Sequence, residues 1–438
     1  MQNHYSIQNA VEIFTTAIAA VKPSRLIPAN ILLQDDTLTI CSKQFTLPPE
    51  GKVHIMGAGK AAAFMAKEME NILGETLSGG IVITKYQHKA STQKIKIIEA
   101  AHPIPDENGV KATDELLAYM QKIKENDIVF FLLSGGASAL LIDLPSTCSL
   151  NDVQQTFDLL LKSGADIEEL NTVRKHLSSI KGGQLAQRIF PAKIITVIIS
   201  DIINDPIDMI GSGPTVADCT TFENAYQIIE KYSLQNRLPA SISKHLQDGL
   251  EKKIKDTPKP GAPCFNNTFN FIIGNNLLAL QAAKNRAINL GYETFVMENA
   301  LQGEARTVGK KIAGDIINYS GKLPVCFIYG GETTVTVLGQ GKGGRNQELA
   351  LAAGIEIQQH KNICIVCAGT DGTDGPTDVA GAFVNRNIMQ KARQLEMNPA
   401  AFLNNNDSYH FFEPLHALLQ TGHTQTNVMD IVIAIKET

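Results

Sequence analysis

Short apolar runs rich in β-branched residues alternate with helical patterns along most of this chain. In the first half the runs at 52–56, 81–84, 128–133 and 194–200 are typical of strands, with helical patterns at 60–73, at 106–122 and around Ala186. Continuous apolar strands separated by helices indicate a mostly parallel sheet that is covered on both faces. The sequence therefore predicts an α/β fold.

A break in this alternation divides the chain. The segment KKIKDTPKPGAP, at 252–263, combines charge with three prolines, as linkers do. Beyond it we expect strands at 269–273, 294–297, 325–329, 333–338 and 363–367, and helices from Asn275, from Glu304 and after Arg345. Since 438 residues exceed the roughly 250–300 that one core fills, we predict two α/β domains, 1–258 and a smaller 259–438. Which domain the last strand joins is left open.

Composition limits the class of function. The chain is 44% hydrophobic and 19% charged with a net charge of −5, and its basic residues are dispersed, so we expect a globular protein that does not bind nucleic acid. The residues from Met1 lack a leader pattern and no run nears the ~20 apolar residues of a membrane span, so we expect a cytoplasmic protein without a membrane partner. A homo-oligomer is left open.

The first chemical motif joins a strand to a helix through Gly57 and Gly59. Such glycines let backbone amides approach an anion. Lys60 follows at the start of the helix, where a cation opposes the helix dipole unless an anion lies between them. This motif favours a phosphate or carboxylate site. A solvated lysine is the alternative.

Two more strand ends carry polar loops. The strand at 128–133 is followed by Ser134, Gly135, Gly136 and Ser138, which could wrap a phosphate or simply form a tight turn. The strand at 194–200 is followed by Asp201 and then by Ser212 and Gly213. A carboxylate at the carboxyl end of a parallel strand can hold Mg²⁺ or take a proton from a hydroxyl, although it can also cap a turn.

The second half has its own polar loops. A glycine-rich stretch leads into Arg345 and Asn346 at the start of a helix, and arginine suits a bidentate clamp on carboxylate or phosphate. The strand at 363–367 ends in a glycine loop with Asp371 and Asp374. Their spacing excludes an EF-hand and suits Mg²⁺ or polyol recognition.

These motifs, in this order, resemble those of the type 2 glycerate kinases over nearly the whole chain. The matching segments are GAGKAA from Gly57, HPIPD from His102, SGGASAL from Ser134, VRKHLSSIKGGQLA from Val173, SDIINDPIDMIGSGPT from Ser200, GGET from Gly330, GKGGRNQE from Gly341, GTDGTDGPTD from Gly369 and TGHTQTNVMD from Thr421. In the last segment the family usually has Pro and Gly where His423 and Gln425 stand, which bears on the shape of the loop and on any role of Asn427.

The resemblance implies ATP- and Mg²⁺-dependent phosphorylation of D-glycerate at its 2-hydroxyl, in a cleft between a Rossmann-like N-terminal domain and the C-terminal domain. It implies catalytic roles for Lys60, Asp201 and Arg345. ATP would contact the glycine and serine loops described above. Glycerate would contact Arg345, Asn346, Asp371 and Asp374, and the metal would contact Asp201 and Asp371.

Two alternatives follow from the same loops. Some members of this family are labelled hydroxypyruvate reductases, and Gly57, Gly59 and Ala62 fit a loose dinucleotide-binding pattern. That pattern includes an Asp or Glu at the end of the next strand to bind the ribose hydroxyls, and this sequence has Thr84 and Lys85 there. The other alternative is a non-catalytic sugar-phosphate-binding protein, which would have no need of the acidic residues.

Overall fold

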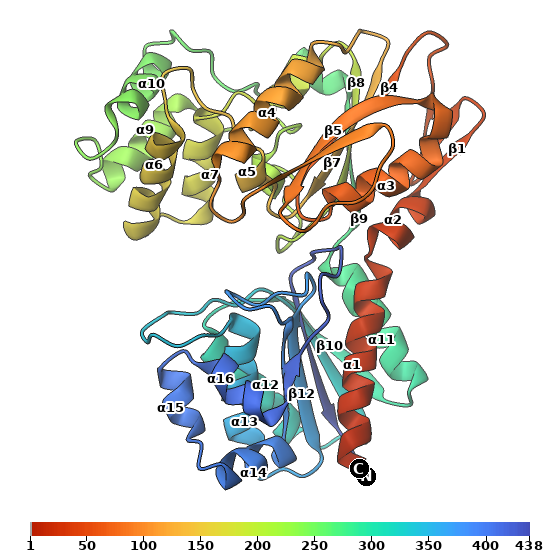
Figure 1. Cartoon of the computed structure of the whole chain (residues 1–438), viewed down its shortest axis with the longest axis vertical. Coiled ribbons are helices and arrows are strands. Elements are labelled where there is room, and N and C mark those ends of the chain that lie inside the picture. The colour runs from red at the N-terminus through yellow and green to blue at the C-terminus, as the bar shows by residue number, and fades with distance from the viewer. Residues whose placement is uncertain (1) are drawn as a thin grey trace. The chain divides into compact units, whose positions relative to one another are not determined.

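The computed structural model describes residues 2–438. Met1, the first residue of the segment predicted to lack a leader pattern, lies outside the described residues. The chain forms two compact units, a large unit of Leu26–Ile273 and a small unit that combines the chain up to Arg25 with Gly274–Thr438 (Figure 1). The division therefore falls fifteen residues beyond 258, and the first helix belongs with the C-terminal residues.

The large unit is built on a six-stranded sheet in the order β6-β5-β4-β7-β8-β9. Parallel pairing joins β6 to β5, β5 to β4, β4 to β7 and β7 to β8. The strands are β4 (Val53–Ala58), β5 (Leu77–Lys85), β6 (Ile95–Ala100), β7 (Ile128–Ser134), β8 (Lys193–Ile199) and β9 (Thr268–Gly274). The four strands predicted in the first half are thus confirmed as β4, β5, β7 and β8.

Helices complete the large unit in two groups. The first group packs with the sheet and includes α3 (Ala62–Leu73), α4 (Glu107–Met120), α5 (Ala137–Leu140) and α8 (Gln184–Ile189). The second group has a hydrophobic core of its own and consists of α6 (Leu150–Lys162), α7 (Ile167–His176), α9 (Phe222–Lys231) and α10 (Ala240–Leu250). A small antiparallel sheet of β1 (Ile31–Gln34), β2 (Thr37–Ile40) and β3 (Lys43–Thr46) follows α2 (Pro23–Asn30).

The small unit contains a mixed six-stranded sheet in the order β10-β11-β15-β12-β13-β14. Within residues 2–438, β10 and β11 form the one parallel pair of this sheet. Strand β15 pairs antiparallel with both β11 and β12, and β13 pairs antiparallel with both β12 and β14. The strands are β10 (Glu293–Leu301), β11 (Val325–Gly331), β12 (Ile363–Gly369), β13 (Gly381–Asn385), β14 (Leu418–Leu419) and β15 (Asp430–Lys436). The last strand therefore stays in the small unit.

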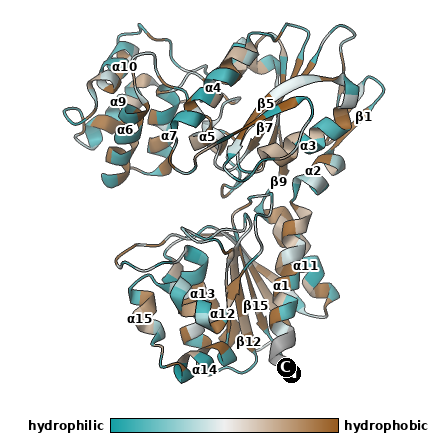
Figure 2. Ribbon diagram, in the orientation of Figure 1, coloured by the Kyte–Doolittle hydropathy of each residue, from teal (hydrophilic) through white to brown (hydrophobic). Residues whose placement is uncertain are grey.

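Helices lie on both faces of this sheet, and its strands are the apolar layer between them (Figure 2). One face carries α1 (Gln2–Ala20) and α11 (Asn276–Asn289), and the other carries α12 (Ala305–Asn318) and α13 (Arg345–Ile357). Beyond these lie α14 (Arg386–Gln394), α15 (Pro399–Asn404) and α16 (Ser408–Phe412).

The strand predicted at 333–338 was wrong, because this segment is a loop with a single bridge from Thr334 to Glu304. Side chains bond its backbone instead. The Thr336 N–H donates to the Glu304 carboxylate at 3.1 Å, and the Leu338 N–H donates to Asn406 Oδ1 at 2.8 Å.

Candidate functional site

Three of the predicted loops share one edge of the large unit's sheet. The strands β4, β7 and β8 are parallel neighbours, with Ala58 opposite Leu133 and Ser134 opposite Ile199. Lys60 therefore follows the end of β4 by two residues, and Asp201 follows the end of β8 by two. Both side chains are half-buried at the carboxyl edge of the sheet, where open α/β sheets bind ligands.

The loop after β4 is held by its own backbone amides. The N–H of Gly59 donates to the Ile83 carbonyl, that of Lys60 donates to the Gly135 carbonyl at 2.9 Å, and that of Ala61 donates to Ser134 Oγ at 3.0 Å. A Cβ on Gly59, whose φ is +137°, would lie 2.2 Å from Ser134 Oγ. These amides are occupied within the protein, so the backbone of this loop is not available to an anion.

The side chains of Lys60 and His102 both lie near the turn that follows β7. A Cβ built on Gly136, whose φ is +85°, would lie 3.4 Å from Lys60 Cγ and 2.9 Å from His102 Nε2. A larger residue at this position would clash with His102 and would be strained at this φ, so the turn requires glycine. His102 opens one of the motifs noted in the sequence, yet no local pattern indicated that it lies near this turn.

The predicted ATP-contacting serines mainly hold loops together. Ser134 is fully buried and accepts the Ala61 N–H. Ser212 is also buried, and its Oγ donates to Asn171 Oδ1 at 2.9 Å and lies 2.9 Å from Ser138 Oγ. Ser138 is half-buried, so it has more access to a ligand than the other two serines.

Gly57 and Gly213 are close-packed glycines. A Cβ on Gly57 would lie 2.4 Å from the Leu132 carbonyl oxygen, and one on Gly213 would lie 2.8 Å from the Asp208 carbonyl oxygen. Their lack of a side chain is explained by strand and loop packing.

In the small unit, Arg345 is the first residue of α13 and is already held by two carboxylates. Its Nε and Nη2 donate to the Asp430 carboxylate at 2.5 and 2.9 Å, and its Nη1 lies 2.7 Å from Glu332 Oε1. The neighbouring Asp430 carboxylate raises the guanidinium pKa further above its usual range, although burial opposes this shift. Asp430 takes the bidentate face of Arg345 that the sequence assigned to a ligand.

Sheet pairing explains how Asp430 reaches Arg345. Asp430 is the first residue of β15 and pairs with Gly331, the last residue of β11, and with Gly369, the last residue of β12. Its carboxylate therefore lies at the edge where both neighbouring strands end. Asp430 ends the motif TGHTQTNVMD, but no local pattern indicates its role, because its partner lies 85 residues earlier in the chain.

Asp374 and Asn346 differ from the expected substrate-binding arrangement. Asp374 is 2% exposed, and its two oxygens accept the backbone N–H and side-chain amide groups of both Asn346 and Gln347. Burial raises the Asp374 pKa to about 6, although the amide donors favour the charged form. Asp374 thus satisfies the first amides of α13, which the helix itself cannot do.

Asp371 is the more open carboxylate of this loop. It is half-buried, and its Oδ1 accepts the N–H and the Oγ1 hydroxyl of Thr373, each at 3.0 Å. A Cβ on Gly369 would lie 3.5 Å from Asp371 Oδ1 and 3.3 Å from Asp430 Oδ1. Asp371 and Asp430 therefore lie on the same side of the sheet edge.

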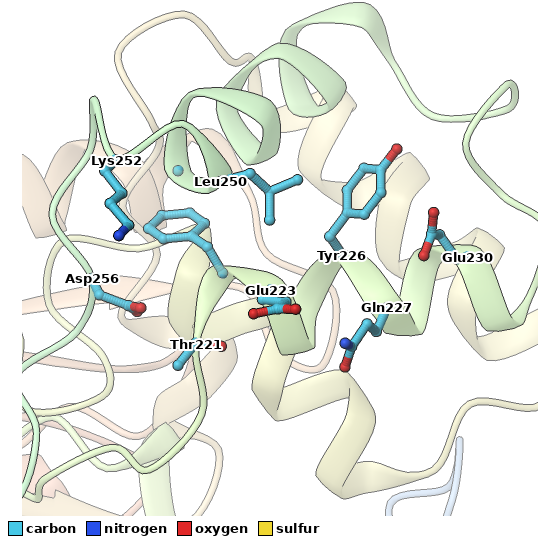
Figure 3. Close-up of a pocket in the computed structure, with 10 residues that line it drawn as sticks. Thr221, Glu223, Tyr226, Gln227, Glu230, Leu250, Lys252 and Asp256 are labelled. Atoms are coloured by element: carbon cyan, nitrogen blue, oxygen red, sulfur yellow. The ribbon is translucent and has the colours of Figure 1, made fainter.

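A roomy pocket elsewhere in the large unit is not associated with these loops. It has a volume of about 480 Å³ and lies by α9 and α10, with Glu223, Tyr226 and Lys252 in its lining (Figure 3).

His176 lies near this pocket and is bonded on both ring nitrogens. Asp256, which also lines the pocket, is 2.9 Å from Nε2 of His176, whose Nδ1 lies 2.8 Å from the Thr172 carbonyl. His176 is therefore buried and bonded within the protein.

Residues 2–438 contain no group of three or more His, Cys, Asp or Glu side chains arranged to hold a metal ion. Within the same residues, no helix is both long and apolar enough to cross a membrane.

Comparison with known proteins gives consistent matches along the chain. Residues 9–247 match the family described as "Domain of unknown function (DUF4147)", and residues 325–430 match the "MOFRL family". A Pyrococcus horikoshii protein named glycerate 2-kinase is 42% identical and covers 96% of this chain and 94% of its own length.

A solved structure and a differently named relative complete the comparison. The crystal structure of a Thermotoga maritima glycerate kinase superimposes with a TM-score of 0.84 at 38% identity, covering 98% of this chain and 99% of that chain. An Agrobacterium vitis protein named "Putative hydroxypyruvate reductase" is 39% identical and covers 87% of this chain and 87% of its own length.

Proposed function

Because this chain belongs to the type 2 glycerate kinase family, we propose that it phosphorylates D-glycerate at the 2-hydroxyl with ATP, giving 2-phosphoglycerate and ADP. The observation that carries this proposal is the meeting of Lys60 with the turn after β7, at the carboxyl edge of a parallel sheet. We place this reaction in the cytoplasm.

Lys60 and Asp201 have the chemistry that phosphoryl transfer needs. The reaction depends on positioning and on cations that face the transferred group. In this proposal the Lys60 ammonium faces the transferred phosphoryl group, since the surrounding amides are bonded within the protein. Asp201 at the end of β8 accepts the proton of the glycerate 2-hydroxyl or contacts the metal.

A magnesium ion fits the carboxylates that are present. Mg²⁺ bound with ATP keeps several waters and takes only one or two protein carboxylates, so a three-ligand cage is not required. Asp201 in the large unit and Asp371 in the small unit are both half-buried, and each is a candidate ligand for the ion. When bound, the ion would neutralise charge on the phosphate oxygens.

Glycerate recognition is assigned to the small unit in this proposal. Arg345 Nη1, which faces Glu332, is the guanidinium edge that the glycerate carboxylate would use, because Asp430 occupies the other edge.

The reductase alternative lacks its ribose-binding acid. Thr84 near the end of β5 is fully buried, and its hydroxyl donates to the Gly59 carbonyl at 3.1 Å. A buried threonine that braces the glycine loop cannot replace a carboxylate on the ribose hydroxyls. This observation disfavours NAD as the cofactor of a reductase and gives a weaker argument against NADP, whose 2′-phosphate does not need this acid.

The metal separates the two activities experimentally. We expect chelation of divalent cations to abolish phosphorylation of D-glycerate and added Mg²⁺ to restore it, because phosphoryl transfer needs a cation to neutralise the charge on the phosphates. Hydride transfer to hydroxypyruvate has no such requirement. Turnover of ATP with D-glycerate and oxidation of NADPH with hydroxypyruvate are to be measured on one preparation. Metal-independent NADPH oxidation that exceeds ATP turnover would contradict the proposal.

A further inference from the structure

An apolar pocket in the large unit lies next to the turn that carries Gly136. It has a volume of about 420 Å³, and all of its lining residues belong to Leu26–Ile273. The walls come from the loop after β6, from α5 and from helices α6 and α7. Pockets of this size commonly hold small organic ligands.

Two large apolar side chains line this pocket while remaining in water. Ile104 is 69% exposed and Leu161 is 61% exposed, and they come from the loop after β6 and from α6. Exposed apolar groups that share one concave surface are unfavourable unless a ligand covers them. The pocket therefore favours a ligand with an apolar surface.

Two polar side chains, Arg174 and Gln154, also line the pocket. The Arg174 guanidinium carbon lies 4.8 Å from the centre of the Phe157 ring, and its Nη1 donates to Asn171 Oδ1 at 2.7 Å. Gln154 also lines the pocket, and its Nε2 donates to the Pro105 carbonyl at 2.7 Å. Arg174 and Gln154 give an apolar slot a polar edge, as recognition of a heteroaromatic base requires.

The pocket adjoins the turn proposed to meet the phosphates through one residue, Ser138. Ser138 lines the pocket and stands two residues after Gly136, above which the Lys60 side chain passes. Asn171, which holds Arg174, also accepts the hydroxyl of Ser212, and Ser212 contacts Ser138. One hydrogen-bonded chain thus links the wall of the pocket to the turn.

We propose that this pocket binds the purine base of the ATP substrate, with the phosphates extending along the turn after β7 toward Lys60. This inference rests on the proposed kinase function. Of the two substrates only the nucleotide has a flat apolar part, because glycerate is a three-carbon acid with two hydroxyl groups. An apolar pocket beside a phosphate site therefore suits the nucleotide and offers few favourable contacts to glycerate.

The test removes apolar surface without adding charge. Leu161→Asn changes an exposed residue of the pocket, and Leu395→Asn changes another exposed leucine, 51% accessible and in the other unit, as a matched control. Calorimetric titration of the full chain with adenosine and with tripolyphosphate separates base binding from phosphate binding. We expect Leu161→Asn to weaken adenosine binding roughly tenfold and to leave tripolyphosphate binding unchanged, a difference of one decade in Kd.

The outcomes distinguish this inference from the proposed function. Adenosine binding that is equal in the wild type and Leu161→Asn, or an equal loss in Leu395→Asn, would overturn the purine site. Lys60→Ala should lose tripolyphosphate binding and retain adenosine binding. Retention of tripolyphosphate by Lys60→Ala would count against the role of Lys60 and leave the purine site standing.

Discussion

At the scale of single residues, Arg345 is less available to a ligand than its place in the sequence indicates. The guanidinium is shared by Asp430, which is 7% exposed, and Glu332, which is 43% exposed. The buried carboxylate fixes the orientation of the arginine, whereas the exposed one can leave. An incoming carboxylate would therefore compete with Glu332.

This arrangement predicts opposite effects of two conservative substitutions. Glu332→Gln should lower the KM for glycerate a few-fold, because it removes a competing anion. Asp430→Asn should raise this KM by about tenfold or more, since hydrogen bonds to charged groups contribute about 1.5–3 kcal/mol. Steady-state kinetics with glycerate as the varied substrate measures both. A shift of both KM values in the same direction would refute the assignment.

Sequence patterns place Arg345 at the start of a helix but do not show what surrounds it. Its partner Asp430 is brought near only because β15 inserts antiparallel between β11 and β12. Likewise, the amides of the Lys60 loop look free in the sequence, yet the neighbouring strands β5 and β7 supply their acceptors. Contacts between distant segments decide which groups remain for a ligand.

At the scale of elements, the loop before β15 explains one departure from the family pattern. Gln425 stands where the family usually has glycine, and its φ is +72°. Its side chain is exposed, while neighbouring residues anchor the loop: Thr426 Oγ1 donates to the Val21 carbonyl at 2.7 Å, and the Val428 N–H donates to Thr370 Oγ1 at 2.8 Å. The anchors keep the glycine-like conformation although glutamine is strained in it.

Gln425→Gly should therefore stabilise the protein. Removing the strain of a non-glycine residue in the left-handed conformation stabilises the folded state by roughly 1–2 kcal/mol. The greater conformational freedom of glycine in the unfolded chain offsets about half of this gain. We expect thermal unfolding followed by circular dichroism to show a Tm rise of roughly 1–3 °C. Gln425→Ala is the matched control, since alanine keeps the strain. An equal rise in both variants would mean that the side chain, not the backbone, causes the effect.

Element prediction succeeded where burial alone decides structure. The strands β4, β7, β8 and β12 are buried along nearly their whole length, so their apolar runs are unambiguous. The run at 333–338 alternates Thr and Val like a strand, but Glu304 and Asn406 bond its backbone in place of a neighbouring strand. Val337 and Leu338 are consequently 71% and 78% exposed.

At the scale of the whole molecule, the two α/β units follow from the alternation of strands and helices, but the path of the chain does not. The amphipathic pattern of α1 shows that one face is buried without showing which sheet covers it. In the structure α1 packs with α11, β12 and β15 of the small unit, so the chain begins and ends in the same unit. The expected boundary at 258 preceded β9, which completes the large unit's sheet.

Transfer of the phosphoryl group from ATP to the 2-hydroxyl of D-glycerate is tested by its product. The purified protein is incubated with ATP, Mg²⁺ and D-glycerate, and enolase is added as the sole coupling enzyme. Enolase converts 2-phosphoglycerate, and not the 3-phosphate, to phosphoenolpyruvate. We expect phosphoenolpyruvate to form with enolase alone. Formation only after phosphoglycerate mutase is added would refute transfer to the 2-hydroxyl.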